Sequence, residues 1–353
     1  MKNIIKTLVV MLSSVSLFAS ANAGELAVSG TAKATYNILS GQTNVGKGIG
    51  ITNELNFTAS GELDNGYTWS YSMELDPADA SAGGAATNDD TQLTLTTPYG
   101  TFGAFVSEGG LDLEDGASQS VYARPTDMGD PSATVDNFTI DSYNNIQYHT
   151  PADLLPFGIT AKIAYATDLD DTNNSGNAAG TTTTSAIEGA GESATEYQVK
   201  AAPIDGLSIG ASYITFDNEG LATKQQDAES GSYMATYTSG PFAVGYSKAY
   251  RSNLIGSLTA SAITETVEYY DQTNMSVAYA ASDNLSVSYE KETSEANYVL
   301  NTTADVEQAS KAIQVAYTMG GMTVAVSHGS HDNVGYTDGA NQDQTLFALT
   351  MAF

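Results

Sequence analysis

Residues 51–75 read ITNELNFTASGELDNGYTWSYSMEL, and apolar and polar side chains alternate along them on both sides of a tight turn. Ile51, Leu55 and Phe57 precede the turn on the apolar phase, and Trp69 continues that phase after it. Alternation with a period of two is typical of a β-strand with two different faces. The Asp-Asn-Gly sequence at 64–66 is a strong hairpin signal. This stretch therefore predicts two antiparallel strands, each apolar on one face and polar on the other.

The same pattern recurs along the chain. Short turns are predicted at 64–66, 98–100, 150–157, 203–206, 239–241, 282–284 and 319–321. Longer polar segments are predicted at 39–49, 76–90, 107–138, 168–195, 217–231, 251–267, 293–308 and 330–344. Seven turns and eight loops in alternation join sixteen strands. An even strand number with both termini on the short-turn side is the arrangement of bacterial outer-membrane barrels.

Periodicity alone does not separate a transmembrane barrel from a soluble β-sandwich, which would bury the apolar face. Segments such as 242–250 and 345–353 have the ~9 to 11 residues that a tilted strand needs to cross a bilayer. The one-sided turn lengths, the 21 tyrosines available for interfacial girdles, and the terminal Phe353 favour the membrane. We therefore expect an all-β, 16-stranded antiparallel transmembrane β-barrel.

Composition limits the function classes. Against 12 basic residues the chain has 41 acidic ones, for a net charge of −29, which opposes nucleic-acid binding because that binding needs Lys and Arg on phosphates. The chain has no cysteine, so it offers no disulfide, thiol catalysis or Cys-ligated metal. No Ser, Thr or His lies in a catalytic motif, so we expect no enzyme and no catalytic residue.

The first 23 residues are typical of an export signal. A positive start precedes an apolar run, and Ala21 and Ala23 form a cleavage site before Gly24. We expect residues 1–23 to be a signal peptide and residues 24–353 to be the barrel domain.

Residues 107–138 form an acidic segment that is too long for a simple connector. Loops of this length inside compact chains are usually functional or disordered. Two interpretations are open: an exposed, solvated loop, or a loop that folds into a water-filled barrel and narrows it.

Three stretches carry a resemblance to a known family: NELNFTASGELDNGY at 53–67, NNIQYHTPADLLPFGITAKIAY at 144–165, and the terminal TLFALTMAF. With them the mature chain resembles the general trimeric porins of the Gram-negative outer membrane, especially the acidic proteobacterial kind. The resemblance implies passive diffusion of ions and small hydrophilic solutes, a homotrimer joined at the first and last strands and the second long loop, and a third long loop folded into the lumen. It also implies contact of Phe353 with the outer-membrane assembly machinery.

In the resemblance, acids of the third loop face basic side chains across the constriction, and strand parity indicates which wall residues point inward. Acids favour cations in a pore, so we expect cation selectivity. The expected constriction acids are Asp112, Glu114, Asp115, Asp127 and Asp130; the basic residues are Arg124, Lys33, Lys162 and Lys200; the lumen-wall acids are Glu54, Glu62, Glu74, Glu196 and Glu290.

Three lysines, Lys248, Lys291 and Lys311, fall on the apolar phase beside predicted long loops. A lysine at the bilayer midplane of a barrel is costly, so we expect all three at the outer rim. They are either solvated there or in contact with lipopolysaccharide phosphates or a neighbouring subunit.

Other sites have weaker support. We expect His328 and His331 to be exposed polar residues at a strand end and not metal ligands. Residues 168–174 are rich in oxygen ligands without EF-hand spacing, so loose Ca²⁺ binding by acidic loops is the one cofactor considered. A secreted β-rich adhesion protein and a substrate-specific porin remain alternatives, and Tyr122 is the third-loop aromatic that bears on the latter.

Overall fold

A computed structural model describes residues 25–42, 44–77, 86–129, 134–167, 169, 193–217, 224–256, 266–300 and 302–353. The expected leader with Ala21, Ala23 and Gly24 lies outside these residues, as do Asp130 and nearly all of the oxygen-rich stretch 168–174. Within the described part, no helix is long and apolar enough to cross a membrane.

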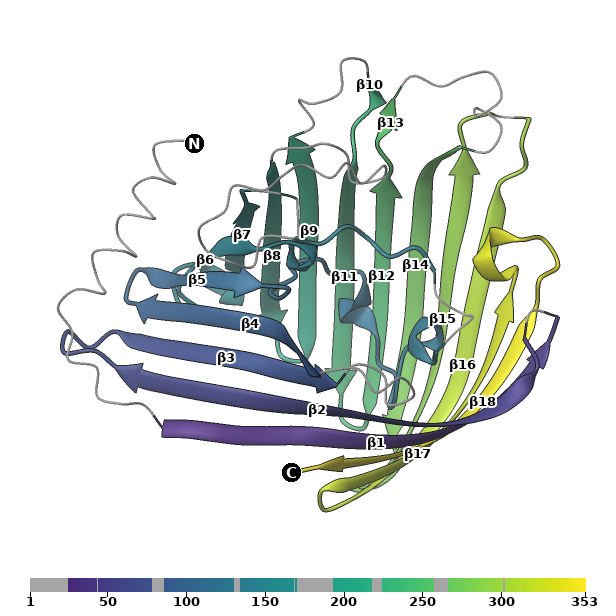
Figure 1. Cartoon of the computed structure of the whole chain (residues 1–353), viewed down its shortest axis with the longest axis horizontal. Helices are drawn as coiled ribbons and strands as arrows, with labels where there is room; N and C mark the ends of the chain where they lie inside the picture. The colour runs from purple at the N-terminus through teal and green to yellow at the C-terminus, as the bar shows by residue number, and fades with distance from the viewer. Residues whose placement is uncertain are drawn as a thin grey trace.

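Sixteen antiparallel strands form a closed barrel, in which each strand pairs with its neighbours along the chain and β1 pairs with β18 (Figure 1). β10 and β13 form a separate two-stranded sheet in the long loops. The strands are β1 (Glu25–Gly41), β2 (Gly46–Glu62), β3 (Thr68–Pro77), β4 (Ala86–Thr97), β5 (Gly100–Val106), β6 (Asn145–His149), β7 (Thr160–Ala166), β8 (Ser193–Ile204), β9 (Leu207–Asp217), β10 (Lys224–Gln226), β11 (Glu229–Ser239), β12 (Phe242–Ser252), β13 (Ile255–Gly256), β14 (Val267–Ala280), β15 (Leu285–Tyr298), β16 (Val306–Met319), β17 (Met322–Asp332) and β18 (Gln342–Ala352).

The two ends of the chain close the barrel. Gly30 of β1 donates its N–H to the carbonyl of Phe353 (2.9 Å), and the Phe353 N–H returns a bond to the Gly30 carbonyl (3.0 Å). A side chain at Gly30 would meet the Phe353 ring at 2.9 Å, so a glycine allows this contact.

The barrel has its apolar side outside and its polar side inside. Ile313 of β16 is 60% exposed, whereas its neighbours along the chain on the inner face, Ala312 and Gln314, are almost fully buried. Gln308, Gln344 and Glu290 are also buried on the inner side. A soluble sandwich would bury the opposite face. The closed, inverted arrangement therefore rules out the sandwich and matches a wall surrounded by lipid.

All seven predicted short turns connect neighbouring barrel strands, which confirms the strand count. Several predicted loops are too long, because the strands continue into them. β1 and β2 leave only residues 42–45 between them, and β15 and β16 leave only 299–305. The third loop is longer than predicted, since β6 starts at Asn145 and the loop therefore covers 107–144.

Candidate functional site

The loop between β5 and β6, residues 107–144 and hereafter the third loop, lies against the inner face of the barrel (Figure 1). Its described part contains three single-turn 3-10 helices: η1 (Asp115–Ala117), η2 (Pro125–Asp127) and η3 (Ile140–Ser142). Because the rest of this backbone makes no regular hydrogen bonds of its own, its buried N–H and C=O groups need other partners. Side chains of the barrel wall supply many of them.

Glu196 of β8 fastens the two ends of the third loop. Its Oε2 accepts the backbone N–H of Leu111 (3.3 Å) and that of Ile140 (2.8 Å). Gln198, on the same strand, donates to the Leu111 carbonyl (2.7 Å). Ile140, Leu111 and Phe138 are buried in an apolar cluster at this point. The carboxylate thus joins segments 29 residues apart within the loop.

Glu290 of β15 holds the middle of the loop. The hydroxyls of Ser118 (2.6 Å) and Ser120 (2.5 Å) both donate to its Oε2, and Asn274 of β14 donates to its Oε1. Neighbouring wall residues continue the series: the Val121 N–H donates to the Ser288 hydroxyl at 3.0 Å. The loop therefore follows the strands β14 and β15 with its backbone bonded to their inward side chains.

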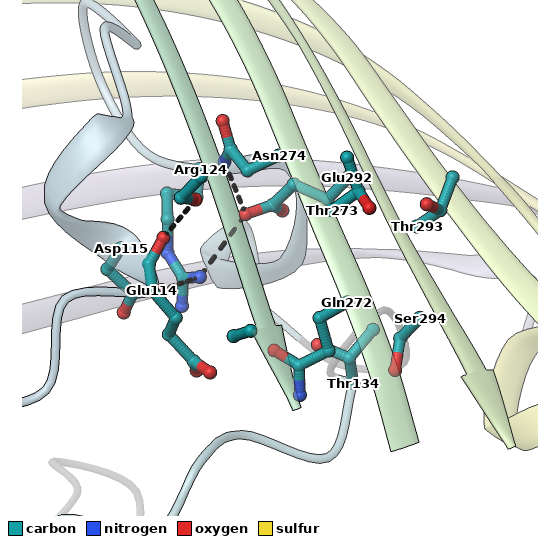
Figure 2. Close-up of a pocket in the computed structure, with 12 residues that line it drawn as sticks. Glu114, Asp115, Arg124, Thr134, Gln272, Thr273, Asn274, Glu292, Thr293 and Ser294 are labelled. Atoms are coloured by element: carbon teal, nitrogen blue, oxygen red, sulfur yellow. Dashed lines mark hydrogen bonds and ion pairs between the residues drawn. The ribbon is translucent and has the colours of Figure 1, made fainter. Parts of the chain in front are cut away.

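Arg124 is the centre of an ion cluster beside this wall (Figure 2). It donates to Asp127 (2.9 Å), to Asp115, and to Oε1 of Glu292 on β15 (3.2 Å). Glu292 also accepts the N–H (3.1 Å) and the hydroxyl (2.7 Å) of Thr126. Charge-assisted bonds of this kind are stronger than neutral ones. One guanidinium is thus shared by three carboxylates, which leaves the cluster negative when all three are ionised.

Two of these carboxylates face the water of the lumen. The side chains of Asp115 and Asp127 are 48% and 55% exposed, whereas those of Arg124 and Glu292 are 13% and 9% exposed. The guanidinium of Arg124 is therefore covered, and the carboxylates of Asp115 and Asp127 are accessible from the lumen. The cluster also borders a cavity of about 20 Å³, about the size of one water molecule, which Glu114, Gln272 and Thr134 help to line (Figure 2).

Asp112 and Glu114 are more enclosed than these two acids. Burial, with the nearby charge of Asp141, raises the pKa of Asp112 to about 6. Partial burial also raises the pKa of Asp115, against the opposing charge of Arg124, although the 48% exposure of this side chain limits the rise. Glu114 is buried and accepts the N–H of Asn137 (3.1 Å), and burial followed by the charge of Asp115 raises its pKa. The charge of the constriction is therefore sensitive to pH near neutrality.

The loop approaches the wall closely at Gly245 of β12. A Cβ at this position would lie 1.7 Å from the carbonyl oxygen of Ala117, so any side chain here would displace the loop. Leu113 and Ala117 are buried beside Met234 of β11 in the same region. The position of the loop against the wall thus depends on the absence of a side chain at Gly245 as well as on hydrogen bonds.

The predicted basic residues have two different positions. Lys33, Lys162 and Lys200 lie on the inner phase of β1, β7 and β8. Lys162 and Lys200 are near the short-turn ends of their strands, whereas Lys33 is in the middle of β1. No ion pair involves these three within the residues that the structure describes. The expectation that Arg124 belongs to an opposing basic side is wrong, because Arg124 lies in the loop and is enclosed by carboxylates.

The predicted wall acids also divide into two groups. Glu54 and Glu62 of β2 are exposed on the inner phase, and Glu54 accepts a bond from the Thr31 hydroxyl (3.3 Å); Glu74 of β3 lies on the same phase. Glu196 and Glu290 point inward as predicted, but the loop covers them, so they anchor it and do not line open water. Sequence reasoning missed Glu292, although strand parity from Glu290 would have placed it inward.

Other expectations can be placed as well. His328 and His331 point to opposite faces of β17, where His328 contacts the Thr345 hydroxyl (2.9 Å) and His331 is buried against the Ser310 hydroxyl (3.0 Å). They do not share a ligand site, and the expectation that both are exposed is wrong for His331. Tyr122 packs against the wall beside Met128, and its N–H donates to Gln314 (3.0 Å).

Comparison with known proteins agrees with this geometry. No curated protein sequence is significantly similar to the chain. Among solved structures, OmpF of Salmonella typhi in complex with daunomycin superposes with a TM-score of 0.64 at 15% identity, covering 94% of this chain and 98% of OmpF. A porin refined at 1.8 Å gives a TM-score of 0.63 at 14% identity over 93% of this chain and all of that one. OmpT of Vibrio cholerae, in its trimer form, gives 0.59 at 14% identity over 94% of this chain and all of OmpT.

These structures share the fold of the barrel. A family model described as Gram-negative porin matches residues 7–353. The match spans nearly the whole chain, and the inverted wall and the internal third loop fit a water-filled channel across the outer membrane. The chain belongs to the Gram-negative porin family and forms an outer-membrane channel for passive diffusion.

Proposed function

We propose that this porin is a general diffusion channel that prefers cations and admits small hydrophilic solutes. The observation that carries the proposal is the Arg124 cluster, in which Asp115 and Asp127 reach the lumen while the only guanidinium of the cluster is covered. A passing ion therefore meets carboxylates first. Acidic rings favour cations in pores, and a cleft of one sign concentrates counter-ions.

The wall opposite the cluster supports the same selectivity. Glu54 and Glu62 are exposed on β2, and Lys33 of β1 is the one lysine on the inner phase of the described parts of β1 to β4. A strongly polarised constriction needs comparable charge of both signs on its two sides. We infer a lumen that filters by negative potential and does not rely on a balanced transverse field.

The test is the reversal potential of the purified channel across a KCl gradient, followed over a series of salt concentrations. We expect a potential of the sign that indicates K⁺ preference at low salt. The preference should weaken towards 1 M KCl, where the Debye length is ~3 Å and the acids are screened. Anion preference at low salt would contradict the proposal.

General diffusion is favoured over a substrate-specific channel by the position of the aromatic side chains. Many of the described tyrosines, such as Tyr197, Tyr246 and Tyr289, are exposed on the outer phase of the barrel. Tyr122 packs with its neighbours against the wall and does not begin a row of stacked rings. An aromatic path for sugars is therefore not part of this proposal.

Export and assembly complete the proposed function. We infer cleavage after Ala23, assembly as a homotrimer like the trimeric form of OmpT, and recognition of Phe353 by the outer-membrane assembly machinery. Outer-leaflet lipid and lipopolysaccharide would surround the wall, and acidic long loops would bind Ca²⁺ loosely. The mass of the mature chain and chemical cross-linking of membranes test the first two inferences directly.

A further inference from the structure

Two lysines lie directly opposite one another on the outer face of the barrel. Lys291 of β15 pairs with Lys311 of β16 in the sheet register, and both are exposed. The adjacent register partners on the outer face, Met275 of β14 and Ser330 of β17, are uncharged. Neither lysine forms an ion pair with any residue that the structure describes. Like charges in directly opposed positions destabilise a sheet, so this pair lacks a counter-charge from its own chain.

The expectation that Lys291 and Lys311 lie at the outer rim is wrong, because β15 continues to Tyr298 and β16 starts at Val306. Lys291 is only six residues from the start of β15. At a rise of ~3.3 Å per residue and a tilt of ~40°, its Cα lies about 15 Å above the short-turn end. The four-carbon stems can carry the ammonium groups further, towards the upper edge of an apolar band about 25 Å tall.

The side chains below and above the pair define this level. Towards the short turns, the outer face is apolar, with Tyr289 on β15 and Ile313 on β16. Towards the long loops, the next pair on the same face is Thr293 opposite Ala309, and beyond it Glu295 lies opposite Glu307, where the charge is negative. An anion is attracted to the lysine level and repelled from the glutamate level. The site is therefore bounded on both sides.

We propose that Lys291 and Lys311 bind the phosphate headgroup of an anionic lipid in the outer leaflet. A lipid supplies both parts that this face lacks: a phosphate for two unpaired ammonium groups, and acyl chains for the apolar wall beneath them. The proposal rests on the location of the barrel in the outer membrane and is independent of its ion selectivity.

Lys248 provides a matched comparison. It also lies on the outer phase, six residues after the start of β12 at Phe242. Its Nζ, however, lies 3.1 Å from a carboxylate oxygen of Asp271 on β14. The same side chain at the same distance from the short-turn end is thus neutralised by its own chain, and it should contribute little to lipid binding.

The experiment compares wild-type protein with K291Q/K311Q, K291R/K311R and K248Q. Each is purified in its native oligomeric state, and lipids bound from mixed micelles of phosphatidylglycerol and phosphatidylcholine are counted by native mass spectrometry. We expect wild type, K248Q and K291R/K311R to retain phosphatidylglycerol preferentially. Its retention by K291Q/K311Q should fall about tenfold or more, since each lysine contributes separately to attraction by anionic headgroups.

Several outcomes would overturn the proposal: equal phosphatidylglycerol retention by wild type and K291Q/K311Q, loss of retention in K291R/K311R, or an equal loss in K248Q. A shift of K291Q/K311Q from oligomer to monomer with unchanged lipid retention would assign the pair to a subunit contact instead. Competition by inorganic phosphate alone at micromolar concentration would assign it to a free anion. If K291Q/K311Q does not fold, the single variants K291Q and K311Q are measured instead, and each should retain less phosphatidylglycerol than wild type. Single-channel conductance is measured in parallel, so that failure of the channel proposal is recognised separately.

Discussion

The inner wall of the barrel has two regions that carry the same residue types, and they differ in whether the third loop covers them. Along β8 to β16 the wall carries Glu292, which bonds to the third loop, and Gly245, whose missing side chain leaves room for Ala117. Along β2 the inner phase carries Glu54, which is exposed, and Gly48, around which a Cβ would meet nothing within 4 Å. The same residue types thus hold a loop in one region and face open water in the other.

Substitution of Glu292 should give the largest difference between the two regions. Glu292→Ala removes the acceptor for Arg124 and Thr126. Arg124 keeps Asp115 and Asp127 as partners, so the main loss falls on the buried N–H and hydroxyl of Thr126, which lose this acceptor. An unsatisfied buried polar group costs about 1 to 3 kcal/mol. We expect the loop to leave the wall, with higher and noisier single-channel conductance. Glu54→Ala is the matched control on the open wall and should leave the conductance trace quiet; equal noise in both variants would contradict an anchoring role.

Gly245→Val should displace the loop by volume alone. A Cβ 1.7 Å from the Ala117 oxygen cannot be accommodated, and overpacking typically costs about 1 to 3 kcal/mol. We expect faster cleavage of the loop by a protease added to purified protein, together with increased conductance. Gly48→Val supplies the same added volume on the open wall. If both variants show wild-type proteolysis, the loop does not depend on this contact.

Neutralising the two exposed acids should change selectivity without releasing the loop. A carboxylate ~4 Å from a passing cation attracts it by about 1 kcal/mol in water-like surroundings, so each acid can change cation preference up to about fivefold. Asp115→Asn with Asp127→Asn should therefore reduce the K⁺ over Cl⁻ permeability ratio, as measured by reversal potential in a low-salt gradient. Glu62→Gln, on the open side, is the control. A larger loss from the control would place the filter on the open wall.

The smallest expected effect is a pH dependence confined to the covered region. Burial raises the pKa of Asp112 from 3.8 to about 6. The pKa of Asp115 is raised as well, but the 48% exposure of that side chain to water makes the rise smaller. Between pH 7 and 5 these acids take up protons, so cation preference should decline. Over the same range the folded protein binds more protons than the unfolded chain, so the free energy of unfolding should rise as pH falls.

This pH effect is measured by reversal potential at several pH values and by thermal unfolding in detergent. Asp112→Asn should flatten both curves between pH 7 and 5. An unchanged curve in this variant would assign the titration to other groups.

Much of the fold follows from local rules. The alternation of side chains and the turn at 64–66 predict the hairpin of β2 and β3, and counting turns gives sixteen strands. Loop lengths were less accurate, because polar residues at 39–49 and 293–308 continue the strands beyond the apolar band. Alternation detects the apolar face of a strand, and it gives no signal where both faces meet water.

The site was predicted only in part, for a different reason. Parity correctly placed Glu196 and Glu290 on the inner face, but whether water or the loop covers an inward residue depends on contacts between distant segments. Ser118 and Glu290, for example, are 172 residues apart. Arg124 was expected to oppose the acids because charge counting cannot show that a guanidinium is enclosed by three of them.

The pairing of β1 with β18 has a consequence for solubility before insertion. An open sheet of this size would present two rows of unpaired backbone groups, and such edges recruit strands from other molecules. Joining Gly30 to Phe353 removes both edges at once. The risk of strand-to-strand aggregation is therefore concentrated in the interval before the ends meet, and refolding yield should fall steeply as the concentration of unfolded chain increases.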